Sequence, residues 1–224
     1  MRHVLAGVLI AVLACSLLWA ALPFTDAFTA ADGTALATYN ANWTVVAQTA
    51  GIYGNAAGCT SGASSCLAKD NSNTYSNDQQ GTGTIKTPAA NYYAGIALRL
   101  STGAAGYLCR VDDNEFQIYR FGTTLKLAEQ ASPTINDGDV MTFTITGNVK
   151  TCTITRASTQ IYQISESSDS TYTSGSAGIG GFGLTSTSST TRIDDVTLDN
   201  YSAGSSAPIR RRPIMMFFTL PELP

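Results

Sequence analysis

The sequence predicts an all-β protein built as a two-sheet antiparallel sandwich. The first observation comes from residues 91–122, where large apolar residues alternate with other residues over two short runs, 96–100 and 107–111. A period of two is the pattern of a strand that buries one face and exposes the other. Second, turn-forming residues follow these runs, as in Asp112-Asp113-Asn114. Third, only 13% of the residues are charged, and the sequence from 24 to 202 has no helical apolar periodicity with caps.

The expected strands follow one another at the short spacing typical of a sandwich. The clearest is 140–146, where Met141, Phe143 and Ile145 alternate with threonines after a turn at 136–139. Such strands predict one buried and one solvated face. The full set of expected strands is 43–47, 83–87, 93–100, 106–112, 115–121, 126–130, 140–146, 151–156, 161–165, 178–184 and 191–200.

Two apolar segments flank the expected sandwich of residues 23–202. Residues 1–22 place Arg2 and His3 before an unbroken apolar run, which is typical of a secretory signal peptide and is also long enough to anchor in a bilayer. Lipidation at Cys15 is a further alternative. Residues 203–224 join a polar linker to a basic and apolar arm. We expect this arm and the apolar segment of residues 1–22, if it is retained, to mediate self-association or attachment to a particle. The alternative is that the C-terminal arm folds back onto the sandwich. The sequence therefore predicts a secreted or cell-surface protein, with a virion surface as the alternative.

Four cysteines follow Cys15, an even number that favours disulfides in an exported chain. Cys59 and Cys66 flank a Gly/Ser-rich loop and predict a local bridge. Cys109 and Cys152 each lie inside an expected strand and predict a second bridge, with two buried thiols as the alternative. A zinc site is not expected, because the single histidine lies in the leader and the cysteines do not form two close pairs.

Several segments, taken in order, resemble the concanavalin A-like (laminin-G-like) jelly-roll superfamily of lectins and glucanases. They are FTDAFTAADGTAL…NWTVV, YYAGIALRL, INDGDVMTFTITGN, SDSTYTSGSAGIGGFGL and TRIDDVTLDNY, within residues 24–201. The resemblance implies a two-sheet jelly roll whose first and last strands are neighbours. It does not choose a function, because the superfamily includes lectins, glycan-binding modules, glycanases and virion components.

The acidic residues do not match the catalytic pattern of the glycanase branch, which resembles E-x-D-x-E on one strand. Alternate strand positions share a face and supply the carboxylate spacing that a retaining glycosidase needs. Of the four glutamates, only Glu115 has a carboxylate two residues away, and that residue, Asp113, belongs to a turn. We assign both to a hairpin tip and expect no catalytic residue, with glycoside hydrolysis as the alternative activity. A nucleophilic triad is excluded in the body of the chain, which lacks histidine.

The expected solvated face of the opening strands offers polar and aromatic side chains for a sugar. Tyrosines at sheet edges also pack there simply with their hydroxyls in water, which is the structural alternative. A net charge of −3 and a pI of about 5.0 argue against nucleic acid as a partner. The candidate carbohydrate-binding residues are Tyr92, Tyr93, Arg99, Arg110, Gln117 and Tyr119.

A structural calcium ion is the one cofactor that the sequence leaves open. Asp26 and Asp32 near the first strand would approach Asp194 and Asp195 in the last strand if those strands pair, and calcium prefers such carboxylate oxygens. The alternative is that these residues are ordinary sheet-edge aspartates. The sequence thus predicts a non-catalytic glycan-binding or adhesive module, with a structural component of an extracellular assembly or virion as the alternative.

Overall fold

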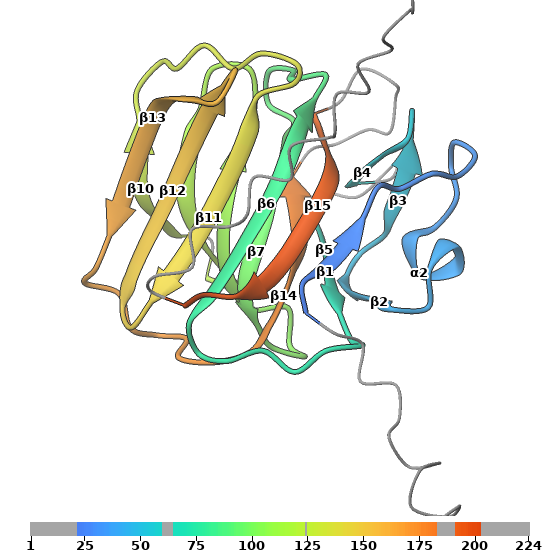
Figure 1. Cartoon of the computed structure of the whole chain (residues 1–224), viewed down its shortest axis with the longest axis horizontal. Coiled ribbons are helices and arrows are strands. Elements are labelled where there is room, and N and C mark those ends of the chain that lie inside the picture. The colour runs from blue at the N-terminus through green and yellow to red at the C-terminus, as the bar shows by residue number, and fades with distance from the viewer. Residues whose placement is uncertain (1–21, 60–64, 124, 183–190, 203–224) are drawn as a thin grey trace, which may run out of the picture.

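Two antiparallel β-sheets packed face to face form the protein (Figure 1). The computed structural model describes residues 22–59, 65–123, 125–182 and 191–202. The eight-stranded sheet has the order β13-β12-β11-β6-β15-β4-β3, with β1 also paired to β15. Its strands are β1 (Phe24–Asp26), β3 (Ala50–Tyr53), β4 (Ala56–Cys59), β6 (Gln79–Lys86), β11 (Val140–Thr146), β12 (Val149–Arg156), β13 (Thr159–Glu166) and β15 (Arg192–Asn200).

The seven-stranded sheet has the order β10-β9-β8-β7-β14-β5-β2. Consecutive strands β7 to β10 form a meander, whereas β14 and β5 come from distant parts of the chain. This confirms the all-β jelly-roll sandwich. The strands are β2 (Trp43–Ala47), β5 (Ser65–Asp70), β7 (Tyr93–Leu100), β8 (Gly106–Val111), β9 (Phe116–Phe121), β10 (Leu125–Gln130) and β14 (Ser176–Phe182).

The first and last strands are neighbours, as the family resemblance implies. Phe24 of β1 lies opposite Leu198 of β15, and Asp26 lies opposite Val196. Along one edge β15 pairs with β6, with an irregularity of register between Asp194 and Thr197. Along its other edge β15 pairs with β1 at Val196–Leu198 and with β4 at Ile193, so two strands share that edge.

The sequence misses several elements of the first third of the chain. Strands β3, β4 and β5 lie outside the expected set, because these short segments are rich in Gly, Ala and Ser and lack alternating large apolar residues. The sandwich also contains one helical turn, α2 (Leu36–Tyr39), which is too short to show periodicity and buries Leu36. Strand β6 begins at Gln79, four residues earlier than expected.

The main core lies between the two sheets and follows the alternation of the strands. In β11, Met141, Phe143 and Ile145 are fully buried, and the intervening Thr142 and Thr144 are only half-buried. This confirms the expected pattern of one buried and one solvated face for this strand.

The seven-stranded sheet departs from that pattern, because over β7 and β8 its outer face is largely buried as well. All six residues of β8 are buried, and Leu108 has no exposed surface although it points away from the main core. It belongs to a second apolar cluster with Leu67, Ala97, Leu100 and Phe121, against which Tyr119 and Phe182 pack. The expectation of a solvated outer face on β7 and β8 is therefore wrong.

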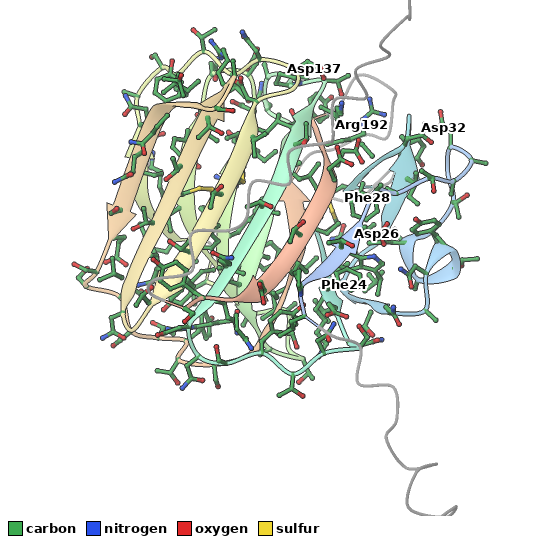
Figure 2. All side chains as sticks on the ribbon, viewed as in Figure 1. Phe24, Asp26, Phe28, Asp32, Asp137 and Arg192 are labelled. Atoms are coloured by element: carbon green, nitrogen blue, oxygen red, sulfur yellow. A yellow bond between two sulfur atoms is a disulfide. The ribbon has the colours of Figure 1, made fainter. Side chains whose placement is uncertain are left out.

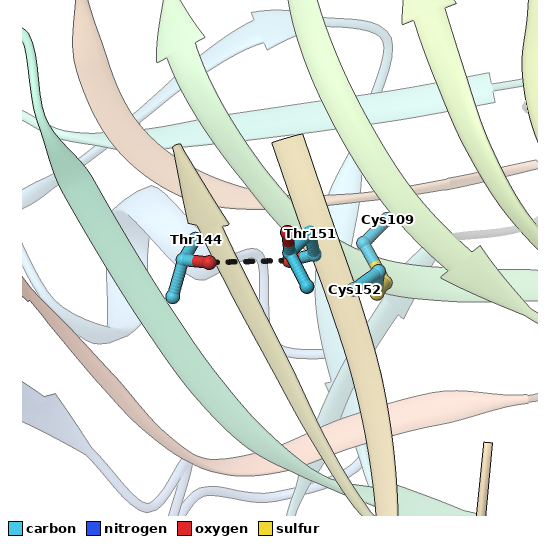
Figure 3. Close-up of a disulfide and its surroundings, with 4 residues drawn as sticks. All are labelled: Cys109, Thr144, Thr151 and Cys152. Atoms are coloured by element: carbon cyan, nitrogen blue, oxygen red, sulfur yellow. Dashed lines mark hydrogen bonds between the residues drawn. A yellow bond between two sulfur atoms is a disulfide. The ribbon is translucent and has the colours of Figure 1, made fainter. Parts of the chain in front are cut away.

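Both expected disulfides are present, and each joins one sheet to the other. Cys59 in β4 bonds to Cys66 in β5, with Cα atoms 5.3 Å apart. Cys109 in β8 bonds to Cys152 in β12, with Cα atoms 6.1 Å apart (Figure 3). This second bridge lies in the centre of the core, where both cysteines are fully buried.

The leader and the C-terminal arm lie outside the described residues. No helix within the described part of the chain is long and apolar enough to cross a membrane. The division into a leader of residues 1–22, a sandwich of residues 23–202 and an arm of residues 203–224 stays a prediction.

Candidate functional site

Four of the six residues expected to contact a sugar meet on the outer face of the seven-stranded sheet. Arg110 of β8 lies opposite Gln117 of β9, and Tyr119 lies two residues farther along β9. Tyr93 of β7 lies opposite Phe182 of β14. Alternate positions of a strand point to the same face, so antiparallel pairing brings these side chains together. We call this set, together with Glu115 and Glu129, the outer-face cluster.

The guanidinium of Arg110 occupies the centre of the outer-face cluster. Its Cζ atom lies 4.1 Å from the ring centre of Tyr93, 4.0 Å from that of Tyr119 and 4.6 Å from that of Phe182. A cation at this distance is attracted by the ring quadrupole, by about 2 kcal/mol where water is excluded. Arg110 is 9% exposed, and burial lowers the pKa of its side chain. The rings thus hold a cation that is largely out of water.

Gln117 connects this cation to two carboxylates through a single amide group. Its Oε1 atom accepts hydrogen bonds from Arg110 Nε at 2.9 Å and Nη2 at 2.6 Å. Its Nε2 atom donates to Glu115 Oε2 at 2.6 Å and to Glu129 Oε1 at 2.9 Å. The amide therefore separates the cation from the carboxylates while fixing the position of all three groups.

The two carboxylates have further partners. Tyr93 donates its hydroxyl to Glu115 Oε2 at 2.5 Å, and Lys126 donates to Glu129 Oε2 at 2.5 Å. The hydrogen bonds from Lys126 and Gln117 lower the pKa of Glu129. Burial, together with the neighbouring carboxylates, raises the pKa of the Tyr93 hydroxyl well above 10.0. At neutral pH Tyr93 is therefore a hydrogen-bond donor and Glu129 an acceptor.

Glu115 differs from its sequence assignment. The structure agrees that a turn lies here, because Asp112 Oδ1 accepts from the amides of Asn114 and Glu115 at 2.9 and 2.6 Å. The side chain of Glu115, however, is held by Tyr93 and Gln117. It belongs to the outer-face cluster, whereas the sequence pattern places it only at a hairpin tip.

Arg99 and Tyr92 do not join the cluster. Arg99 lies near the end of β7 with a positive φ of 53°, and its guanidinium donates to the carbonyls of Asn77, Tyr172 and Gly147 at 2.9, 3.0 and 2.6 Å. It is 2% exposed and ties three loops together. Tyr92 precedes β7, and its amide donates to Ala89 in a short turn. The structure thus gives Arg99 a structural role.

The four aspartates considered for calcium do not form a common site. Asp26 accepts four hydrogen bonds, from Phe28 N at 2.9 Å, Tyr39 Oη at 2.9 Å, Asn40 Nδ2 at 3.1 Å and Trp43 Nε1 at 2.8 Å. These donors engage both carboxylate oxygens, so Asp26 holds the segments that follow β1 in place (Figure 2). Such a satisfied carboxylate is a structural anchor and a poor metal ligand.

The remaining aspartates have separate partners. Asp32 accepts from the amide of Gly54 at 2.6 Å, in the turn between β3 and β4. Asp194 accepts from the amide of Asp195 at 2.8 Å, and burial raises the pKa of Asp194, helped by the neighbouring carboxylates of Asp195 and Asp26. Among the described residues, no group of three His, Cys, Asp or Glu side chains is placed to hold a metal ion.

An open cavity of about 470 Å³ lies where β1 meets the irregular position of β15. Its walls are polar, but the carboxylate of Asp26 is already bonded on both oxygens. Among the described residues that line it, there is no aromatic cluster comparable to that around Arg110. The lining residues are Thr25, Asp26, Ala27, Tyr39, Asn40, Asp195, Val196 and Thr197.

Three residues in or beside the cluster are not among the site residues predicted from the sequence. Glu129 belongs to the cluster, and Phe182 and Lys126 contact it. Glu129 and Gln117 lie directly opposite each other on β10 and β9. This pair could have been found by aligning the two expected strands as a hairpin. Phe182 comes from β14, 63 positions after Tyr119 in the sequence, and only the sheet order brings the two together.

Comparison with known proteins shows the fold. No protein-family model and no curated protein sequence matches this chain. Among solved structures, a carbohydrate-binding module, CBM66, from Bacillus subtilis matches with a TM-score of 0.55 at 17% identity, covering 71% of this chain and 96% of that one. The transglycosylase Crh5 in complex with NAG matches with a TM-score of 0.51 at 16% identity, covering 82% and 86%.

Two further solved structures are similar in fold. The exoplasmic/lumenal domain of VIP36, in its Ca²⁺- and mannose-bound form, matches with a TM-score of 0.50 at 9% identity, covering 74% of this chain and 85% of that one. The CBM2 module of the evolved Dit protein of Lactobacillus casei BL23 phage J-1 has a TM-score of 0.51 at 13% identity, covering 80% and 96%. The chain has the concanavalin A-like jelly-roll fold, and the fold alone does not separate binding modules from enzymes.

Proposed function

We propose that this chain is a non-catalytic glycan-binding module of the extracellular space, and that its ligand contacts the outer-face cluster of the seven-stranded sheet. The observation that carries the proposal is the convergence of Tyr93, Arg110, Gln117 and Tyr119 on one face. Two interior disulfides support export, because such bonds persist in oxidising compartments. Binding modules and a lectin among the structures that share the fold add further support.

The chemistry of the cluster suits a sugar. The rings of Tyr119 and Phe182 are half-exposed and offer apolar edges for the C–H groups of a sugar ring. Arg110 and Glu115 offer charged groups, whose hydrogen bonds to hydroxyls are stronger than those of neutral groups. Because their side chains are already fixed by Gln117, little conformational entropy is lost when a ligand binds.

Glycoside hydrolysis is the second candidate, because Glu115 and Glu129 share one hydrogen-bond donor. Gln117 Nε2 donates to one oxygen of each carboxylate, so Glu115 Oε2 and Glu129 Oε1 lie close together. Their separation is compatible with the spacing of about 5 Å between the two carboxyl groups of retaining glycosidases. Such an enzyme needs one protonated carboxyl at the start of its cycle. Here the hydrogen bonds from Lys126 and Gln117 lower the pKa of Glu129, so Glu129 is unsuited to be that protonated carboxyl. This arrangement supports binding over hydrolysis.

The test is affinity electrophoresis against a panel of polysaccharides, repeated with Tyr119→Ala. We expect the wild-type protein to be retarded by at least one polysaccharide, without release of reducing ends. Loss of the ring should weaken binding about tenfold, which corresponds to about 1.4 kcal/mol. Tyr119→Phe should retain most of the affinity because the ring remains.

The matched control is Thr153→Ala on the outer face of the opposite sheet, which should bind like wild type. Equal loss of affinity in Thr153→Ala and Tyr119→Ala would place the ligand elsewhere. Release of reducing ends that stops in Glu115→Gln and Glu129→Gln would show that the pair is catalytic.

A role in an extracellular assembly is the alternative, and the phage Dit module that shares the fold supports it. In that role the arm of residues 203–224 mediates self-association or particle attachment. Truncation after Gly204 should then leave the melting temperature unchanged and abolish self-association. A lower melting temperature with unchanged self-association would assign the arm to the fold of the monomer.

A further inference from the structure

The outer-face cluster leaves three polar atoms without a hydrogen-bond partner among the described residues. Arg110 uses Nε and Nη2 for Gln117, and its Nη1 atom has no partner. Glu115 accepts both of its hydrogen bonds on Oε2, which leaves Oε1 without one. The hydroxyl of Tyr119 likewise has no partner. The cluster therefore presents one cationic donor, one anionic acceptor and one hydroxyl.

The donor and the acceptor lie close together. Arg110 bonds to the oxygen of the Gln117 amide, and Glu115 bonds to the nitrogen of the same amide. The guanidinium of Arg110 and the carboxylate of Glu115 therefore lie at the two polar ends of the Gln117 amide. A sugar that spans the Gln117 amide can accept from Arg110 through one hydroxyl and donate to Glu115 through another.

The charges of the cluster do not favour an acidic ligand. Arg110 and Lys126 are balanced by Glu115 and Glu129, and the buried carboxylate of Asp112 is near enough to act on Arg110. The sum over these five side chains is negative. An acidic sugar placed against Arg110 would also lie beside Glu115, and like charges brought together at a binding site cost several kcal/mol.

We propose that the outer-face cluster selects uncharged sugars and rejects sugars that carry a carboxylate. This selectivity rests on the proposed glycan-binding function and adds to it the chemical class of the ligand. Arg110 and Glu115 are the residues that set it. Glu115 acts as acceptor for the neutral sugar and as the repulsive element against the acidic one, which is how specificity is commonly built.

The experiment is isothermal titration of the full chain with oligosaccharides of equal length in two sets. One set holds neutral gluco-, manno-, galacto- and fructo-oligosaccharides, and the other holds oligouronates. We expect at least one neutral oligosaccharide to bind more than about tenfold tighter than every oligouronate, the ratio that a repulsion of about 1.4 kcal/mol produces. Glu115→Gln removes the charge but keeps an oxygen acceptor, so it should reduce this ratio toward one.

The control is Asp195→Asn, which makes the same change of charge on the other side of the sandwich. Asp195 is exposed and has a φ of 47°, a conformation that asparagine adopts readily. This variant should keep the wild-type ratio of affinities.

The outcomes separate the two proposals. Oligouronates that bind as tightly as the neutral sugars, or a ratio that Glu115→Gln does not change, would overturn the selectivity and leave glycan binding intact. If no member of either set binds, the proposed function itself is wrong, and the selectivity with it.

Discussion

The two outer faces of the sandwich differ although their strands share the same alternating pattern. On the eight-stranded sheet, Thr142 of β11 lies between Thr82 of β6 and Thr153 of β12, and all three side chains are half-buried. Thr144 of the same face donates to the carbonyl of Thr151 at 3.4 Å (Figure 3). On the seven-stranded sheet, the corresponding surface carries Leu108 and the aromatic rings around Arg110.

The alternation of residues in a strand determines which side chains face the main core, but it does not determine whether the opposite face is solvated or covered by other side chains. Threonine fits a pleated surface in contact with water, so the eight-stranded sheet has a conventional solvated face. On the seven-stranded sheet, the lack of a side chain at Gly180 lets the side chain of Leu67 lie over β14. A Cβ atom at Gly180 would approach Leu67 Cδ2 to 2.4 Å. Here the outer face has packed side chains and fixed polar groups, as a binding surface requires.

The strongest test of this comparison is a pair of truncations on the two faces. Leu108→Ala should reduce the free energy of unfolding by about 2–5 kcal/mol, because it opens a cavity in a buried cluster. Thr142→Ala should change it by no more than about 0.5 kcal/mol, because the side chain lies on a solvated surface. Urea denaturation measures both. Similar values for the two variants would mean that the outer faces are alike.

The two disulfides both join one sheet to the other, but they close chain segments of different length. Cys109 and Cys152 are 43 positions apart, and Cys59 and Cys66 are 7 apart. Replacing the first pair by alanines should destabilise the protein by about 1–2 kcal/mol more than replacing the second, since a longer closed loop restricts the unfolded chain more. Guanidinium denaturation of the two variants measures the difference. A larger loss of stability on removal of the Cys59–Cys66 bridge would contradict this expectation. It would show that the local restraint of β4 and β5 contributes more to stability than the length of the closed loop.

The outer-face cluster should also give the seven-stranded sheet a pH dependence that the threonine face lacks. Hydrogen bonds from Lys126 and Gln117 hold the pKa of Glu129 below its ordinary value of 4.5. The contribution of a carboxylate with a lowered pKa is fully present above the ordinary value and disappears as the pH falls through the folded-state pKa. The difference in melting temperature between wild type and Glu129→Gln should therefore be constant from pH 7 to 5 and vanish on further acidification. A difference that grows in acid would contradict the assigned hydrogen bonds.

Calcium removal is expected to have the smallest effect on either face. Both oxygens of Asp26 are occupied by donors, and Asp32 is held in a different turn. The melting temperature should be the same in excess calcium and in a chelator. A fall of several degrees on chelation would restore the calcium site that the sequence left open.

The sequence predicts the sandwich well, because period-two alternation in strands such as β11 is a direct consequence of burying one face. It also predicts both disulfides and four residues of the outer-face cluster. It misses strands β3 to β5, where small residues give no periodic signal. From the alternation of residues along the strand, the sequence predicts that Arg99 lies on the same face as the cluster. In the structure Arg99 has a positive φ, and its side chain points toward three loop carbonyls instead.

The remaining members of the cluster depend on pairings that a linear sequence does not contain. Phe182 reaches Tyr93 only because β14 inserts beside β7. Glu115 and Glu129 become neighbours only through the Gln117 side chain between them. Long-range strand order and side-chain hydrogen bonds of this kind require the folded structure.

The most direct test of the account is to record which amide signals shift when a bound oligosaccharide is titrated into the ¹⁵N-labelled protein. We expect the largest shifts for the amide signals of Tyr93, Arg110, Gln117 and Tyr119, and no shift for those of Thr142 and Thr153. Shifts confined to the threonine face, or to the cavity beside Asp26 and Asp195, would contradict it.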